Sequence, residues 1–384
     1  MLVKKELTMS ILFCGDVMPG GVLPYQKEYL SKDVLDYMKS FDFRIGTLEA
    51  AIGTNLGYDQ IKMKGRQNIV YARNEDFFRV VEMGFDVVSL ANNHVFDLGI
   101  EGLRNTIEIL DKNGIKHCGA GENIVEASKP AVIDYKGKSI AILAYCMYGN
   151  SYLGYVELAG VDKPGINPLD IEKVVADIRK YKKQHDYVVV MPHWGQEYQY
   201  FPLVECKEMA YQMIDAGADV IMGSHAHNIQ PMVKYKGRVI YFGMGNFLFP
   251  DFYMTPPRPI WYPKSGVDLS NVKKVEGYPY PIKEPIISVW NGRSRIGIVG
   301  SMDISKSKIL VEYIFVYLSA NNIVKFYDCF NKYLKRFRMC WMGRIIKCPN
   351  YKFLLRWYDS RFNIPRRLLH KVSRVLNINY DVKL

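Results

Sequence analysis

Short apolar runs alternate with longer amphipathic runs from residue 10 to about residue 250. This alternation predicts β-strands connected by helices, which is the pattern of an α/β fold. The stretches FDVVSL, YVVVM and DVIMG are almost continuously apolar, as strands covered on both faces tend to be. We expect strands at 10–14, 43–49, 85–91, 138–145, 187–192, 218–223 and 238–249, and helices at 26–39, 74–83, 99–113, 168–183 and 204–216. Gly84, Gly114 and Gly217 closely follow three of these helices, as helix-ending glycines do.

A side chain that could bind a metal stands at the end of five of the expected strands. SILFCGD ends at Asp16, FRIGTLE at Glu49, DVVSLANNH at Asn93 and His94, DYVVVMPH at His193, and ADVIMGSHAH at His225 and His227. In an open α/β sheet, the carboxyl ends of the strands are where loops converge and ligands bind. Imidazole and carboxylate groups together suit zinc, manganese or iron, and a carboxylate can bridge two ions. The sequence therefore predicts a metal site at this edge.

Each of these residues also has an ordinary structural explanation when it is considered alone. Asp16 could be a turn residue after Gly15, and Glu49 could be a charge at the start of a helix. Asn92 fits a turn former better than a ligand, while His117 and His185 flank helices and fit the surface. The set as a whole favours metal binding, because burying several polar groups without partners would be costly.

The chain is long enough for one large domain with an appendage, and we expect the α/β domain to span residues 1–318. Within it, eight prolines between residues 250 and 286 predict a long loop, and residues 286–317 regain strand character. Residues 319–384 are expected to form a basic, aromatic, helical extension with a second helix from Pro365. The apolar stripe of its first helix is expected to contain Phe330, Tyr333, Leu334, Phe337, Trp341 and Ile345.

The net charge of +12 belongs to the C-terminal extension, since residues 325–384 contain 15 Lys and Arg against 3 Asp and Glu. Three roles for this extension stay open. Its helices could dock on the core with a solvated basic face, or attach to an anionic membrane surface on the cytoplasmic side. Nucleic-acid binding is the third, but no recognition module or Gly-rich phosphate loop supports it.

The cysteines and the N-terminal residues bear on the cellular location. The seven cysteines are scattered without a CxxC motif, which is typical of reduced thiols in a cytoplasmic protein. MLVKKELTMSILFCGD reaches an acidic residue before an adequate signal peptide could fit, and no apolar run is long enough to span a bilayer. We therefore expect a cytoplasmic protein, with peripheral attachment to the inner membrane face as an open alternative.

Six motifs give the chain a clear resemblance to a known family. GDVMPGG, GTLEAAI, SLANNHVFDLG, MPHWGQEY, DAGADVIMGSHAHNIQP and YFGMGNFLF resemble, in this order, the CapA-type capsule and poly-γ-glutamate biosynthesis family. That family is a branch of the calcineurin-like metallophosphoesterase superfamily. The resemblance covers roughly residues 10–250 and implies a four-layer αββα sandwich of two central mixed sheets flanked by helices.

The resemblance also implies roles for individual residues around two divalent ions, for which manganese, zinc or iron suit a site of this composition. One ion would bind Asp16, Glu49 and His227, and the other would bind Glu49, Asn93, His193 and His225. His94 matches the histidine that acts on the leaving group, and Asp97 would orient an imidazole. Trp194, Glu197 and Asn246 stand in family motifs and are candidates for lining the substrate pocket.

One departure concerns the position two residues after Asp16, where the wider superfamily usually has a histidine and this chain has Met18. The resemblance implies a metal-dependent phosphoesterase-like enzyme in the biosynthesis or modification of an anionic surface polymer. Its partners would be that polymer or a precursor and other capsule-assembly proteins. Met18 leaves a non-catalytic scaffold open as the alternative, and an amide-bond-forming transferase or ligase is a third possibility.

Overall fold

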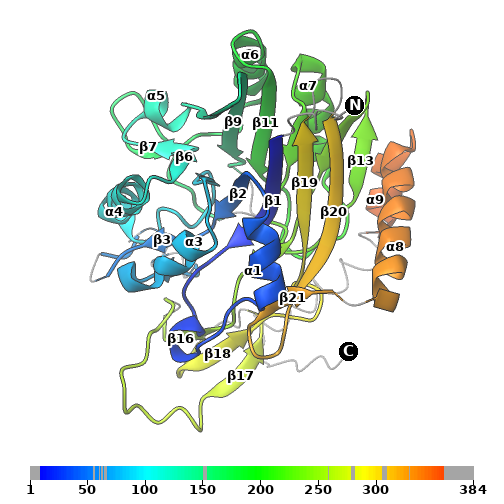
Figure 1. Cartoon of the computed structure of the whole chain (residues 1–384). Coiled ribbons are helices and arrows are strands. Elements are labelled where there is room, and N and C mark those ends of the chain that lie inside the picture. The colour runs from blue at the N-terminus through cyan, green and yellow to red at the C-terminus, as the bar shows by residue number, and fades with distance from the viewer. Residues whose placement is uncertain are drawn as a thin grey trace, which may run out of the picture.

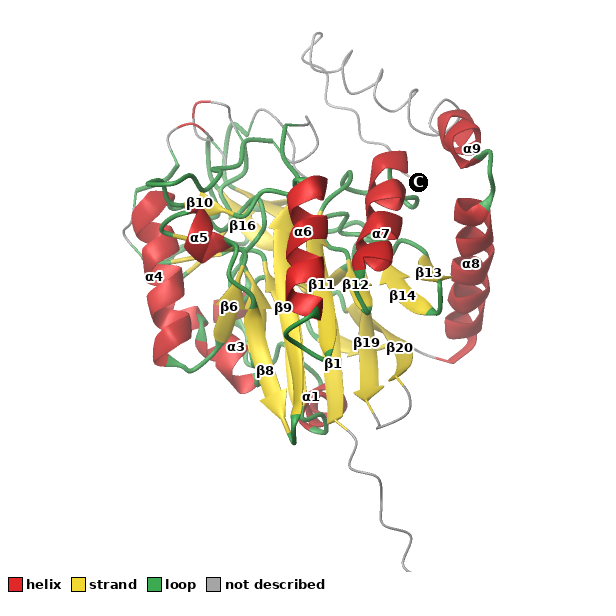
Figure 2. Ribbon diagram, turned by 90° about the horizontal axis from the view of Figure 1, so that it is seen from above, coloured by secondary structure: helices red, strands yellow, loops and turns green. Residues whose placement is uncertain are grey.

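The computed structural model describes residues 9–54, 57–59, 61, 64, 67–149, 154–257, 259–277, 282–304, 309–327 and 329–358. Two mixed β-sheets lie face to face in the centre of the molecule, and helices cover their outer faces (Figures 1 and 2). The four-layer α/β sandwich that we expected is therefore confirmed.

The larger sheet has eight strands in the order β21-β20-β19-β1-β2-β5-β6, and β15 also pairs with β1. Strand β1 runs parallel to β2 and β15 and antiparallel to β19, so the sheet is mixed. Its strands are β1 (Met9–Val17), β2 (Phe43–Leu48), β5 (Val87–Ser89), β6 (Lys116–Cys118), β15 (Asn246–Leu248), β19 (Ile296–Ile304), β20 (Ile309–Leu318) and β21 (Val324–Phe326).

The smaller sheet has six strands in the order β13-β14-β12-β11-β9-β8. The four central strands are parallel, and the two edge strands are antiparallel to their neighbours. Its strands are β8 (Ala131–Tyr135), β9 (Lys138–Cys146), β11 (Tyr187–His193), β12 (Val220–Met222), β13 (Met232–Tyr235) and β14 (Arg238–Tyr241).

Strand β9 shows why these strands are apolar on both sides. Ile140 and Ile142 point into the core between the two sheets, where they join Phe13 of β1. Ala141 and Leu143, which alternate with them, belong to a second core beneath the helices. Because neighbouring side chains in a strand point to opposite faces, a strand between two cores must be apolar at every position.

Helices form the two outer layers. Helices α6 (Ile171–Lys182) and α7 (Val204–Ala216) cover the smaller sheet, while α1 (Lys32–Lys39), α3 (Phe78–Glu82) and α4 (Gly99–Lys112) pack against the larger one. A short helix, α5 (Ile124–Ala127), lies beside α4. The glycines expected to end α3, α4 and α7 all have positive φ, at +71°, +67° and +120°.

The proline-rich segment carries more structure than the loop that we expected. Strands β16 (Phe252–Met254), β17 (Lys273–Glu276) and β18 (Ile286–Val289) form a three-stranded sheet, in which Phe252 faces Ser288. The pairing partner β18 lies outside the proline-rich stretch, so local composition gave no indication of it. Two further pairs are β3 (Ala51–Ile52) with β4 (Tyr71–Ala72) and β7 (Ala120–Gly121) with β10 (Gly165–Ile166).

The larger sheet continues through β21 to Phe326, past the boundary expected at residue 318. Helices α8 (Cys329–Lys347) and α9 (Tyr351–Tyr358) follow, with α8 beside β13 (Figure 1). No helix among the described residues is both long enough and apolar enough to cross a bilayer. The helix expected from Pro365 lies outside the described residues.

The expected apolar stripe of α8 is wrong for Phe337 and Trp341, which are exposed. Met339, Met342 and Ile346 are the large side chains of α8 that are buried between residues 335 and 347. A Cβ atom on Gly343 would lie only 3.0 Å from the carbonyl oxygen of Met232. The helix therefore approaches β13 through its glycine side, and this close approach selects the docked face.

Candidate metal centre

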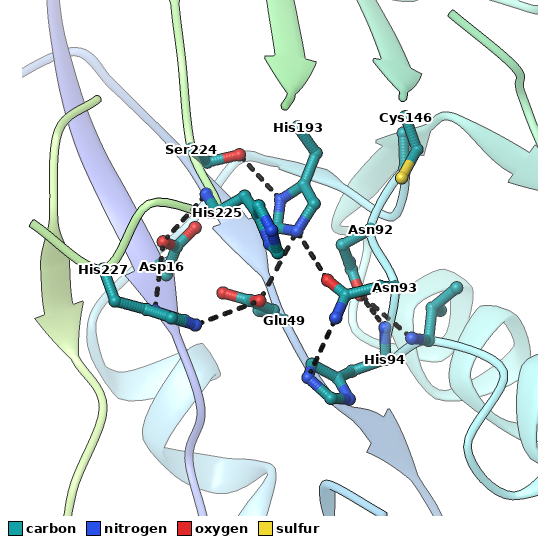
Figure 3. A network of polar contacts seen from close by, with 12 residues as sticks. Asp16, Glu49, Asn92, Asn93, His94, Cys146, His193, Ser224, His225 and His227 are labelled. Atoms are coloured by element: carbon teal, nitrogen blue, oxygen red, sulfur yellow. Dashed lines mark hydrogen bonds and ion pairs between the residues drawn. The ribbon is translucent and has the colours of Figure 1, made fainter. Parts of the chain in front are cut away.

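Strands from both sheets end at one rim of the molecule, and the six expected metal ligands meet there (Figure 3). Asp16 is the last but one residue of β1, and Glu49 directly follows β2. His193 ends β11. Asn93 stands in the turn after β5, and His225 and His227 lie in the loop after β12.

The donor atoms form two groups that share one carboxylate. Asp16, Glu49 and His227 each offer an atom within 4.8 Å of the others, and so do Glu49, His193 and His225. The side-chain oxygen of Asn93 lies 2.7 Å from Nε2 of His193, which puts this amide at the second group. Both groups match the two ligand sets that the family resemblance implies, with Glu49 between them.

The two carboxylates are completely buried, which makes their negative charge costly. Burial raises the pKa of Asp16 from its usual 3.8 to about 7, against an opposing contribution from the backbone N–H of His225, which lies 3.3 Å from Oδ2. Burial and the negative charge of Asp16 raise the pKa of Glu49 well above its usual 4.5. The protein alone therefore disfavours two carboxylate anions here.

Two of the imidazoles beside them, those of His193 and His227, have lowered pKa values and so are neutral at physiological pH. Burial, followed by repulsion from the neighbouring imidazoles, lowers the pKa of His193 well below 6.5. Burial likewise lowers the pKa of His227 to about 3. A neutral imidazole offers a nitrogen lone pair, which is the form that binds a metal ion.

The geometry fits a cation between these groups. The side-chain oxygen of Asn246 lies 2.8 Å from Nδ1 of His227, so Nδ1–H donates and the lone pair of Nε2 faces the Glu49 carboxylate at 3.6 Å. Among the described residues, the Glu49 carboxylate has only the equally acidic Asp16 carboxyl as a side-chain hydrogen-bond partner. Electron-rich atoms face one another across the rim, and a divalent cation there would offset the cost of burying them.

The loop after β12 holds its two histidines in an unusual backbone conformation. His225 has a φ of +83° and His227 a φ of +50°, a region that residues other than glycine seldom adopt. Such conformations cost of order 1–3 kcal/mol each and persist where the surroundings fix them. Here the loop turns tightly enough to present two imidazoles, one residue apart, to different donor groups.

A hydrogen-bonded pair, formed by His94 and Asp97, lies beside the donor groups. Nδ1 of His94 is 2.6 Å from the Asp97 carboxylate, which also accepts a hydrogen bond from the backbone N–H of Val70 at 2.7 Å. Nε2 of His94 lies 3.1 Å from the side-chain nitrogen of Asn93. Asp97 therefore orients His94 so that Nε2 faces the expected ligands.

The three residues expected to line a substrate pocket have different surroundings. Trp194 is buried in the core beneath the helices, and its indole N–H donates to the carbonyl of Phe242 at 2.9 Å. Asn246 is buried and holds His227. Glu197 is half-buried, and its negative charge contributes to the raised pKa of Glu49.

Asn92 behaves as the turn former that we expected, and Met18 lies in the loop after β1. The side-chain oxygen of Asn92 accepts hydrogen bonds from the backbone N–H groups of His94 and Val95, both at 2.9 Å, as a turn former does. Met18 is buried, and its sulfur lies 3.1 Å from the backbone N–H of Gly20.

Sequence reasoning missed the residues that support the histidines. The ring centroid of Trp290 lies 4.9 Å from that of His227, and the ring of Phe249 lies 5.2 Å from it. The hydroxyl of Ser224 lies 2.8 Å from Nδ1 of His193. Ser224 could have been found from its place inside the GSHAH motif, but Trp290 comes from a distant strand end and has no local sequence pattern.

Comparison with known proteins agrees with this geometry. The family described as bacterial capsule synthesis protein PGA_cap matches residues 10–251, which include every expected ligand. The PGA biosynthesis protein CapA of Bacillus subtilis is 32% identical over 250 residues, and the capsule biosynthesis protein CapA of Bacillus anthracis is 32% identical over 256 residues. The matched regions cover 63% and 64% of this chain but only 63% and 60% of those relatives.

Among solved structures, the NAD nucleotidase of Haemophilus influenzae aligns with 93% of this chain and 60% of its own length, at 13% identity and a TM-score of 0.39. We infer nothing about function from so distant a likeness. The family match extends over more than half of the chain and includes both donor groups. The chain therefore belongs to the bacterial capsule synthesis family PGA_cap, a branch of the calcineurin-like metallophosphoesterase superfamily.

Proposed function

We propose that this chain is a metal-dependent phosphoesterase-like enzyme in the biosynthesis or modification of a capsular or other anionic surface polymer. The observation that carries the proposal is the sharing of Glu49 by two groups of donors, since a bridging carboxylate is what a two-metal hydrolytic site needs. The family, and the relatives from Bacillus species, support an anionic polymer such as a polysaccharide or poly-γ-glutamate, or its precursor, as the substrate.

Two divalent ions, manganese, zinc or iron, would supply Lewis-acid activation of the substrate and of water. Asp16, Glu49 and His227 would hold one ion, and Glu49, Asn93, His193 and His225 the other. The protein contributes two carboxylates and neutral imidazoles to these positions, so the loaded site would keep a net positive charge. Such a site prefers an anionic group, and a phosphoryl group fits this preference.

His94 would act as the general acid. The Asp97 carboxylate keeps the proton of the imidazole on Nδ1, so Nε2 is the nitrogen that can exchange a proton with the substrate. In this arrangement, Nε2 of His94 would donate a proton to the leaving oxygen.

The test combines metal analysis with turnover of a generic phosphodiester, bis(p-nitrophenyl) phosphate. The purified protein should contain close to two equivalents of a transition metal, and His225→Ala should lower both metal content and turnover, the latter at least about 100-fold. His185→Ala is the matched control, because His185 contacts Ser139 at the other end of β9. Unchanged metal content and turnover in His225→Ala would remove the proposal.

A non-catalytic scaffold is the second candidate, and Met18 is the observation that favours it. Met18 stands where the superfamily usually has a histidine, and its sulfur faces the backbone N–H of Gly20. One of the two ions would therefore have few protein ligands. If His94→Ala leaves polymer production intact in cells while removal of residues 329–384 abolishes it, the scaffold is the correct function.

A further inference from the structure

Helices α8 and α9 are docked on the protein through one face only. Met339, Met342 and Ile346 of α8 and Tyr351 of α9 are buried, and the Tyr351 hydroxyl donates a hydrogen bond to the carbonyl of Pro202. The two helices lie at the edge of the molecule, beyond β13 and α7 (Figures 1 and 2). Arg336 and Arg338 of α8 also reach back over the rings of Tyr313 and Tyr200, whereas Phe337, Trp341 and Phe353 are exposed.

Three large aromatic side chains of these two helices are exposed. Phe337 and Phe353 are each 71% exposed, and Trp341 is 54% exposed. Phe337 and Trp341 are four residues apart in α8 and so lie on the same side of that helix. Exposed aromatic rings of this size are unfavourable in water, and their grouping on two short adjacent helices indicates a surface that is covered in use.

All charged residues of the same two helices are basic. Residues 329–358 contain eight Lys and Arg and no Asp or Glu. Arg344, Lys347 and Lys352 are exposed, and Arg344 lies seven residues after Phe337, on the side of α8 that carries the aromatic rings. The surface thus combines apolar anchors with positive charge and has no acidic residue to repel an anion.

We propose that this face, formed by Phe337, Trp341, Arg344, Lys347, Lys352 and Phe353, docks on a membrane surface rich in anionic lipid. Aromatic side chains on a helix that lies in the interface enter the boundary between headgroups and acyl chains, while Lys and Arg attract anionic headgroups. Attachment would be peripheral, because no described helix can span a bilayer. An acidic polymer would engage the cations but leave the three rings in water, so the lipid surface fits the whole face better.

The test is flotation of the full chain with vesicles, compared between phosphatidylcholine alone and phosphatidylcholine containing phosphatidylglycerol. We expect binding to the anionic vesicles only, weakened by salt. Phe337→Ser, Trp341→Ser and Phe353→Ser together should weaken it at least about tenfold. Arg344→Gln, Lys347→Gln and Lys352→Gln together should weaken it about 100-fold.

Control variants test whether vesicle binding depends on this face and not on exposed aromatic or basic residues in general. They also test whether it is independent of the metal centre. Phe78→Ser removes a 52% exposed aromatic ring elsewhere, and Lys27→Gln, Lys39→Gln and Lys183→Gln remove exposed charges elsewhere; neither change should alter vesicle binding. Metal content should stay the same in every variant, so failure of docking is distinguishable from failure of the proposed function. Equal binding to neutral vesicles, or binding to soluble polyglutamate but not to vesicles, would overturn the membrane assignment, as would full retention of binding by both triple variants.

Discussion

Two side chains outside the donor groups fix the orientation of the histidines at opposite ends of the metal centre. Asp97 orients His94, and Asn246 orients His227, in each case through Nδ1. Each leaves Nε2 facing the expected ligands. Residues that fix a tautomer in this way often matter almost as much as the ligands, because the wrong tautomer presents an N–H where a lone pair is required.

Asp97→Asn tests the role of the first pair. An amide can present its N–H group to Nδ1, which would shift the imidazole proton to Nε2, and it cannot stabilise an imidazolium as a carboxylate does. We expect turnover of the phosphodiester to fall about 10–100-fold, while metal content stays unchanged. A loss of metal together with turnover would instead indicate that Asp97 supports the ligands and not the acid.

Asn246→Ala tests the second pair. In contrast to Asp97→Asn, we expect this substitution to lower metal affinity. Without its side-chain oxygen, Nδ1 of His227 loses its acceptor, and the imidazole is free to rotate or change tautomer. Metal affinity should fall about 10–100-fold, as measured by titration of the metal-free protein with zinc or manganese. Asn105→Ala is a control, since that amide bonds the carbonyl of Ile52 away from the centre.

At this scale the sequence indicated which candidate donors lie together, but not most of the residues that support them. Asp16, Glu49 and His193 could be found because each stands where an apolar run ends, and strand ends converge at one edge of a sheet. Trp290 could not, because its contact with His227 depends on the path of β18 rather than on any local pattern. Trp194 stands in a motif beside His193, yet successive side chains in an extended chain alternate sides, and its ring lies in the outer core.

Glycines determine how closely three elements of the larger sheet approach one another. A Cβ atom on Gly15 of β1 would lie 1.9 Å from the carbonyl oxygen of Gly245, just before β15. A Cβ atom on Gly297 of β19 would lie 2.0 Å from the carbonyl oxygen of Asn246. Because both obstacles are backbone atoms, a side chain at either position would force β15 to move. Asn246, the residue that holds His227, would move with it.

Gly15→Ala is therefore expected to lower both the stability of the protein and the metal affinity of the centre. The free energy of unfolding should fall by about 1–3 kcal/mol or more, which is the usual cost of overpacking. Metal affinity should fall as well. Gly292→Ala is the control, because a Cβ atom there meets nothing within 4 Å. Denaturant unfolding of the two variants checks the prediction, and equal stabilities would contradict the close approach.

The elements that the sequence predicted best are those whose pattern is set by burial on both faces. Strands β9 and β11 have nearly the expected bounds because they lie between two cores. Short edge pairs such as β3 and β4 escaped prediction, since two residues carry too little periodicity. The docked face of α8 escaped it because the helix has apolar residues on both sides, and only Gly343 shows which side approaches β13.

On the scale of the whole molecule, the centre joins the two sheets. Asp16 and Glu49 come from the larger sheet, and His193, His225 and His227 come from the smaller one. Removal of the metal should therefore weaken the packing of one sheet on the other and lower the melting temperature. Ligand binding to the folded state alone stabilises by mass action, so added zinc or manganese should restore the melting temperature in a concentration-dependent way.

Asp16 should give the metal-free protein a pH dependence of definite sign. In the unfolded chain the carboxyl of Asp16 loses its proton near pH 3.8, whereas in the folded protein its pKa is about 7. At this group the folded state binds more protons than the unfolded state, so its contribution to stability falls as pH rises from about 4 to about 7, while the lowered pKa values of His193 and His227 contribute with the opposite sign below about pH 6.5. Calorimetry of chelator-treated protein isolates the Asp16 contribution as the difference between wild type and Asp16→Asn, and a difference that does not shrink with rising pH would show that Asp16 is not isolated from solvent.

The division of the ligands between the sheets makes a bound cation a crosslink in the folded structure. Neither half of the sandwich could then open at this rim by itself, and the amide hydrogens near the ends of β1 and β12 should exchange with solvent in concert. The lifetime of the bound ion would then limit the rate of local opening: the slower the ion dissociates, the longer the amide hydrogens at these strand ends stay protected.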